Sequence, residues 1–147
     1  MGFSVSGSTA VILVGLLISA GTLYPALDHY TEQRADALTA RSERALTQQN
    51  TALETGAVTY NTTTSELTVT VQNTGASTLA VSKLDLLVDG SYQALPAAAT
   101  AVDNDTMTDV WAPGEPMTIT LTVTSTPSRI KLVTGPGVAV TAPVEVQ

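Results

Sequence analysis

The N-terminal stretch limits the fold most, because no charged side chain occurs from Met1 to Leu27. The portion from Thr9 to Leu27 is strongly apolar and about as long as a membrane-spanning helix, which needs roughly 20 residues. A buried helix that is apolar on every face would need a larger core than the rest of this chain can build. We therefore predict a transmembrane helix in residues 1–27. The residues expected to form its membrane face are Val11, Leu13, Val14, Leu16, Leu17, Ile18 and Leu23.

No Lys or Arg precedes this apolar stretch. A secretory signal has a basic region before a shorter apolar core and a small-residue cleavage site after it. We therefore expect the stretch to be retained as an anchor.

Residues 28–55 keep a helix-forming composition but carry charges of both signs, and we interpret them as a polar helical stalk. Pro25 is expected to kink the helix near the membrane boundary, and Gly56 is expected to end it. Apolar or small residues that recur every three or four positions form a seam along this helix. The seam contains Thr, Ser and Gln, so it is compatible equally with weak helix association and with a single solvated helix. The seam residues are Leu27, Thr31, Ala35, Leu38, Ser42, Leu46, Gln49 and Leu53.

From residue 56 to residue 147 the apolar residues alternate with polar ones, which is typical of half-buried antiparallel strands. Turn sequences such as Asp89-Gly90 and Pro113-Gly114 separate the runs. This pattern predicts an immunoglobulin-like β-sandwich of about seven strands, with residues 94–110 as an irregular crossing between its sheets. The alternating apolar residues are Val58 and Tyr60; Leu67, Val69 and Val71; Leu84, Leu86 and Val88; Ile119, Leu121 and Val123; Ile130 and Leu132; and Val138, Val140, Ala142, Val144 and Val146. The predicted fold class is α+β, with a long membrane and stalk helix followed by an all-β domain.

The single tryptophan, Trp111, precedes the predicted turn at Pro113-Gly114. A sandwich normally uses such a residue to fill its core, and this is the interpretation we favour. The alternative is an exposed anchor for a binding partner.

The charge balance excludes one class of partner. The chain has 13 Asp and Glu against 6 Lys and Arg, for a net charge of -7, whereas nucleic acid binding requires a basic surface. An acidic, Lys-poor and Thr-rich chain fits a protein kept soluble at high salt. Because there is no cysteine, neither a disulfide nor a thiolate metal site can form.

The sequence offers little that could perform catalysis or bind a metal. His29 is the only histidine, and we expect it to be solvated or interfacial. The acidic series Asp103, Asn104, Asp105 and Asp109 resembles the start of a calcium loop, but it lacks the tight glycine and the bidentate glutamate. No nucleophile elbow or phosphate-binding loop occurs. We therefore predict no enzymatic activity, no cofactor and no metal.

Two sequons make Asn61 and Asn104 candidate glycosylation sites, and both lie in predicted turns or loops. Glycosylation would place the β-domain outside the cell. Arg34, Arg41 and Arg44 oppose this, because positive residues beside a membrane helix favour the cytoplasmic side. These arginines are interleaved with acidic residues, so we expect the β-domain to be extracellular.

Three segments together resemble the F-type (FlaF) accessory proteins of the haloarchaeal flagellum, or archaellum. They are the N-terminus Met1-Gly2-Phe3-Ser4-Val5-Ser6-Gly7-Ser8 before the apolar helix, the strand and turn Leu67-Thr68-Val69-Thr70-Val71-Gln72-Asn73-Thr74-Gly75, and the segment Trp111-Ala112-Pro113-Gly114-Glu115. Archaellins, pilins and G-type accessory proteins share the plan of a helix followed by a sandwich. The chain departs from archaellins in one respect, since Gly2 follows only Met1 where they carry Lys or Arg before the processing glycine.

The resemblance implies a non-enzymatic part of the archaellum motor, inserted in the membrane and bound to the surface layer (S-layer) as a static anchor. It further implies the S-layer protein, G-type accessory subunits and the membrane as partners, with a possible homo-oligomer. No binding residue carries over, so the edge strands of the sandwich, with unpaired backbone groups, are the candidate binding sites. Two alternatives remain: a polymerising filament subunit of the archaellin or pilin type, and a membrane-tethered receptor or enzyme.

Overall fold

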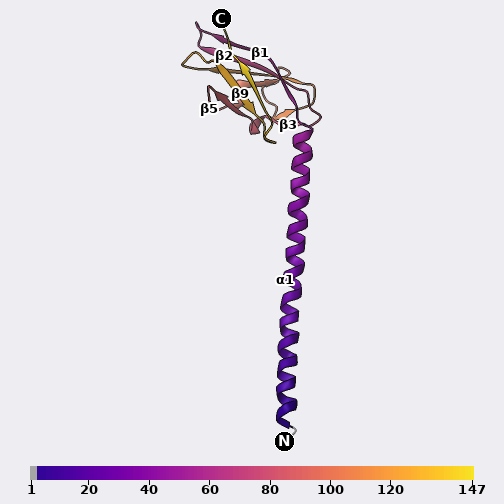
Figure 1. Cartoon of the computed structure of the whole chain (residues 1–147). Helices are drawn as coiled ribbons and strands as arrows, with labels where there is room; N and C mark the ends of the chain where they lie inside the picture. Colours follow the sequence, from indigo (N-terminus) through magenta and orange to yellow (C-terminus); the bar gives the residue numbers. More distant parts are fainter. Residues whose placement is uncertain (1–2) are drawn as a thin grey trace. The chain divides into compact units, whose positions relative to one another are not determined.

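The computed structural model describes the backbone of residues 3–147 and the side chains of residues 7–21 and 32–147. The chain begins with one long helix, α1 (Phe3–Gln49), and every strand follows it (Figure 1). It divides into two compact units, Met1–Glu43 and Arg44–Gln147. The prediction of an α+β chain with its helix at the N-terminus is confirmed.

The first unit consists of α1 up to Glu43, and the helix is continuous through Pro25. Ser19 and Thr39 donate their hydroxyl hydrogens to the carbonyls of Gly15 and Ala35, four residues earlier, so these polar groups are satisfied within the helix. Among the side chains that are described, no helix is both long and apolar enough to cross a membrane.

Helix α1 ends at Gln49, and the prediction that Gly56 ends it is wrong. The Thr51 hydroxyl donates to the Thr47 carbonyl at 2.7 Å and so satisfies a free carbonyl of the last turn. The Asn50 carbonyl then accepts two amides from a loop of the β-domain, those of Ala76 and Ser77. These bonds stop the helix before the glycine is reached.

Gly56 instead lies within the first strand, β1 (Leu53–Asn61), which pairs with β2 (Glu66–Asn73). The pairing register shifts between Thr55 and Val58, so Gly56 belongs to a β-bulge. Glycine inside a strand often marks such a site.

Three sheets make up the second unit. The five-stranded sheet has the order β11-β1-β2-β8-β6, the four-stranded sheet β10-β9-β4-β5, and the small sheet β3-β7. The described residues 3–147 form eleven strands, more than the seven predicted, because several are only two or three residues long. The remaining elements are β3 (Leu79–Ala80), η1 (Val81–Lys83), β4 (Asp85–Val88), β5 (Ser91–Gln93), η2 (Ala97–Ala99), β6 (Thr100–Val102), β7 (Val110–Trp111), β8 (Pro116–Thr122), β9 (Arg129–Val133), β10 (Ala139–Pro143) and β11 (Glu145–Val146).

The two larger sheets contribute to one hydrophobic core, and most predicted inward residues lie in it. Leu67 and Ile119 from one sheet, and Leu86 and Ile130 from the other, are fully buried. The period-two prediction of strand faces is therefore confirmed for these strands, but it is wrong for Val146, which is 54% exposed. The core consists of Val58, Tyr60, Leu67, Val69, Val71, Leu79, Val81, Leu84, Leu86, Val88, Val102, Trp111, Met117, Ile119, Val123, Ile130, Leu132 and Ala142.

Trp111 fills the core as predicted, with no exposed surface. Its indole Nε1 donates to the Glu115 carbonyl at 2.8 Å, so burial leaves the ring N–H satisfied. The intervening turn needs Gly114, whose φ of +84° is unfavourable for other residues. The alternative of an exposed Trp anchor is excluded.

Residues 94–110 do pass between sheets, from β5 to β6, but they are less irregular than predicted. They contain the 3₁₀ turn η2 and the strand β6, which pairs with β8. Asp103 and Asn104 then adopt left-handed conformations, with φ of +47° and +70°, in a tight turn. Asp and Asn tolerate this region of backbone space better than most residues.

The last predicted strand is divided between two sheets. Pro143 ends β10, and β11 then pairs in parallel with β1 in the other sheet. The prediction of purely antiparallel pairing is wrong at this edge. Proline has no N–H to continue the ladder, which explains where the strand breaks.

Candidate functional site: the exposed surfaces

The predicted membrane residues are highly exposed on α1. Exposure ranges from 53% at Val14 to 73% at Val11. Because the apolar positions follow one another closely along the helix, they cover all of its faces. A continuous apolar surface of this kind marks contact with lipid or with a partner. Val11, Leu13, Val14, Leu16, Leu17 and Ile18 belong to this surface, whereas Leu23 lies outside the described side chains.

Further along α1, two apolar residues of the predicted stalk seam, Leu38 and Leu46, are also more than half exposed. This exposure is compatible with helix association and with a solvated stalk, so both interpretations stay open. His29 lies outside the described side chains.

Both candidate glycosylation asparagines are exposed, Asn61 as the last residue of β1 and Asn104 in a turn of the β-domain. The Asn61 side-chain oxygen accepts the amides of Thr63 and Thr64 at 2.9 and 3.2 Å, which shapes the turn between β1 and β2. Asn104 lies in the tight turn after β6. Glycosylation at these positions stays a prediction.

The acidic residues after β6 stabilise their own loop. The Asp105 carboxylate accepts the Met107 amide at 2.8 Å. The Asp109 carboxylate accepts the Ser82 amide and hydroxyl, at 2.6 and 3.0 Å. In the described part of the chain, no three His, Cys, Asp or Glu residues gather closely enough to hold a metal. The loop presents Met107 with 92% of its side chain exposed.

The open sheet edges are β11 and β6 in the larger sheet, and β10 and β5 in the smaller one. Unpaired backbone groups at such edges can accept a strand from a partner. Two exposed apolar side chains accompany these edges, Tyr92 on β5 and Val146 on β11. The candidate binding sites expected from the sequence were the edge strands of the sandwich, and these four strands are the edges of the two larger sheets.

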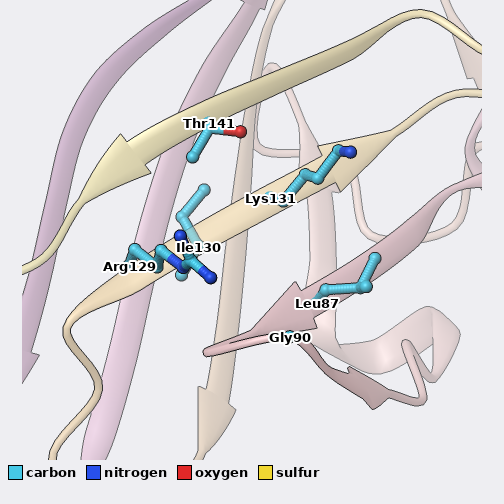
Figure 2. Close-up of a pocket in the computed structure, with 6 residues that line it drawn as sticks. All are labelled: Leu87, Gly90, Arg129, Ile130, Lys131 and Thr141. Atoms are coloured by element: carbon cyan, nitrogen blue, oxygen red, sulfur yellow. The ribbon is translucent and has the colours of Figure 1, made fainter.

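A hollow on the four-stranded sheet is a surface that the sequence did not predict. It has a volume of about 260 Å³ and is lined by Leu87, Gly90, Arg129, Ile130, Lys131 and Thr141. Figure 2 shows Arg129, Ile130 and Lys131 along β9, with Thr141 on one side of that strand and Leu87 and Gly90 on the other. Strand pairing produces this grouping, because Lys131 is the register partner of both Leu87 and Thr141.

Two basic side chains line this hollow, although the chain as a whole is acidic. Arg129 and Lys131 are two of only three basic residues that follow Arg44 in an acidic chain. A sequence signal was available, since these two residues alternate with the buried Ile130 and Leu132 and must therefore share the outer face.

Asp89 fixes one end of the hollow through the turn that precedes β5. Its carboxylate accepts the Ser128 hydroxyl at 2.6 Å, and it also accepts the amides of Ser128 and Arg129. The Ser128 hydroxyl contributes most to lowering the pKa of the Asp89 carboxyl below its usual 3.8, and the two amides and the Arg129 charge add to it. The lowered pKa keeps Asp89 ionised beside Arg129.

Comparisons with solved structures give partial likenesses. The complex of the archaellum periplasmic stator proteins FlaF and FlaG from Sulfolobus acidocaldarius matches with a TM-score of 0.42 and 18% identity, over 61% of this chain and 85% of that one. FlaG of the same organism matches with a TM-score of 0.42 and 19% identity, over 63% and 97%. The ligand-binding region of serine-glutamate repeat protein A from Enterococcus faecium matches with a TM-score of 0.33 and 11% identity, over 65% and 97%.

The sequence comparison is more decisive than these structural likenesses. No curated protein matches the chain. The model of the archaeal-type flagellin family matches residues 2–144, which is nearly the whole chain. Together with the N-terminal helix and the β-domain, this match shows that the chain belongs to the archaeal-type flagellin family and is an archaellum-related protein.

Proposed function

We propose that this protein is a non-enzymatic structural component of the archaellum motor that anchors it to the cell envelope. In this proposal the N-terminal helix is inserted in the membrane as a single pass. The β-domain, an immunoglobulin-like sandwich, lies outside the cell, where it binds the S-layer protein and resists the torque of the turning filament. Accessory subunits of the G type are the further partners.

The observation that carries the proposal is the contrast between the two units. Seven large apolar side chains from Val11 to Ile18 are exposed on all faces of α1 and require a lipid or protein environment. The β-domain, in contrast, buries most of its apolar side chains in one core. An anchor needs both properties, because one end must be held and the other must bind.

The acidic composition supports the extracellular part of the proposal. A net charge of -7 with few lysines suits a chain that stays soluble in a salt-rich medium. Glycans at Asn61 and Asn104 would lie at exposed positions, where they would not disturb the core. The proposed location is therefore the archaeal cell surface, between membrane and S-layer.

Binding to isolated S-layer material tests the anchoring function. The fragment should begin at Arg44 rather than at Gly56, because the Asn50 carbonyl and Leu53 take part in the β-domain. We expect this fragment to bind S-layer sheets saturably, and cells lacking the protein to assemble filaments that do not drive motility. Absence of S-layer binding, together with loss of the filaments, would contradict the proposal.

A polymerising filament subunit is the second candidate. It is favoured by the family match, which covers the helix as well as the β-domain. In this case α1 would pack against copies of itself in the filament core, and the stalk seam at Leu38 and Leu46 would contribute. Electron microscopy of the purified full-length chain distinguishes the two, since only a filament subunit should form long fibres.

A further inference from the structure

The loop between β6 and β7 presents an apolar tip surrounded by acidic residues. Met107 is 92% exposed, which is the greatest exposure among the large apolar side chains described. Its neighbours Asp105 and Asp109 hold the loop through hydrogen bonds to the Met107 amide and to Ser82. The tip is therefore held outward in a defined loop, and a flexible, polarisable methionine is well suited to fill an irregular hollow.

The hollow on the four-stranded sheet has the opposite character. Leu87 supplies its apolar part, since the Ile130 side chain faces the core, while Arg129 and Lys131 place two positive charges along β9 (Figure 2). Its volume of about 260 Å³ lies below the roughly 300 to 1,000 Å³ that is typical of small-molecule pockets. A hollow of this size suits one protruding side chain better than a cofactor.

We propose that the Met107 tip of one copy of this protein inserts into the hollow of a second copy. Met107 would contact Leu87, and the acidic residues around the tip would lie beside Arg129 and Lys131. The occupant is argued from charge complementarity, because this hollow gathers most of the positive charge of an otherwise acidic β-domain. The tip, in contrast, combines an exposed apolar side chain with acidic neighbours.

The geometry of such a contact determines the kind of assembly. Tip and hollow belong to different elements, the loop after β6 and the strands β4, β9 and β10. Reciprocal insertion of both tips closes a two-fold dimer, whereas insertion of one tip into one hollow is a heterologous contact. A heterologous contact leaves one free tip and one free hollow on every pair, and it extends into rows or closes into rings. This inference does not depend on the anchoring proposal, since it concerns only contacts between β-domains.

Cysteine cross-linking of the full-length chain tests the contact. The sequence contains no cysteine, so only the introduced cysteines can form disulfides. Met107→Cys protein is mixed with Thr141→Cys protein under mild oxidation in detergent, and the mixed dimer is quantified. Thr141 is chosen because it lines the hollow and is exposed, so its replacement should not disturb folding. Thr63→Cys, on the exposed turn after β1, replaces Met107→Cys in the control mixture.

We expect the tip and hollow mixture to cross-link severalfold faster than the control mixture. Adding Lys131→Glu to the Thr141→Cys protein should slow the reaction to the control rate, because it places like charges together. Equal rates in the two mixtures would overturn the proposal, since helix association would bring all exposed cysteines together alike. Preferential formation of Thr141→Cys homodimers would also overturn it, because that result indicates a symmetric contact between sheets.

Discussion

The side-chain amide of Asn73 donates a hydrogen bond to the backbone carbonyl of Trp111 at 3.2 Å, and both residues are fully buried. The same amide donates to the Ser77 carbonyl at 2.9 Å, and the Asn73 side-chain oxygen accepts the Gly75 amide. One polar side chain thus joins the end of β2, the turn that follows it and β7.

We expect Asn73→Ala to destabilise the β-domain by about 2 to 4 kcal/mol, because the buried Trp111 carbonyl and the part-buried Ser77 carbonyl lose their donor. Chemical denaturation of the full-length chain in detergent measures this change. Asn50→Ala is the matched control, since its side chain is exposed, and it should cost less than about 0.5 kcal/mol. Equal denaturation midpoints would show that the buried network contributes nothing.

The burial of β8 predicts a ranking of three substitutions. Ile119→Ala should cost about 2 to 5 kcal/mol because it leaves a cavity in the core. Leu121→Ala should cost less, since Leu121 is only partly buried, and the exposed Thr120→Ala should cost least. Thermal unfolding checks this order. A melting temperature that falls most for Thr120→Ala would mean that the opposite face of β8 is buried.

Two glycines should respond oppositely to alanine. A Cβ at Gly75 would lie 2.5 Å from both the Ala52 nitrogen and the Asn50 oxygen, so Gly75→Ala should destabilise by at least about 1 kcal/mol. At Gly56 the nearest atom would be the Thr70 carbonyl oxygen at 3.4 Å, an ordinary contact. Gly56→Ala should therefore be neutral or stabilising by up to about 1 kcal/mol. Urea denaturation gives both values, and a shared sign would contradict the prediction.

The lowered pKa of Asp89 predicts a pH-dependent contribution to stability. Because the pKa is lower in the folded state than in the unfolded state, the contribution is complete above the usual pKa of 3.8 and is lost as the pH falls through the folded value. Asp89→Asn removes the titration while tolerating the positive φ of +49°. We expect the variant to be less stable at pH 7 and the difference to shrink below about pH 4. A difference that grows on acidification would contradict the assigned direction.

The proposed membrane insertion is tested within the exposed apolar part of α1. Val14→Arg or Leu17→Arg should cost about 2.5 to 3.5 kcal/mol of insertion energy and shift the protein out of the membrane fraction. Leu38→Arg, on an exposed position of the stalk, is the control and should leave fractionation unchanged. If the variants at residues 14 and 17 stay in the membrane fraction as well as the parent does, α1 does not insert.

Local pattern was enough to predict the helix and the faces of the long strands. Leu67 and Ile119 lie in alternating runs, and alternation alone determines which side of a strand faces the core. The turn at Asp89-Gly90 followed from residue chemistry, and both residues have the positive φ that such a turn requires.

The features missed by the sequence depend on long-range pairing. Gly56 resembles a helix terminator, but its role is decided by Thr70 on the neighbouring strand. The hollow could not be located because Lys131 meets Leu87 and Thr141 only after β4, β9 and β10 have paired in register. The parallel pairing of β11 could not be predicted either, because its partner β1 is far away in the sequence.

That pairing of β1 with β11 also constrains when the domain can finish folding. Thr59 and Tyr60 obtain their partners Glu145 and Val146 only after residues 145 and 146 have been synthesised, and the Gln147 amide still has to reach the Tyr60 carbonyl. During synthesis the outer edge of β1 is therefore open and able to pair with a neighbouring nascent chain. An insertion directly after Gln147 would begin at this hydrogen-bonded edge, whereas an insertion at an exposed turn would leave the closing step undisturbed.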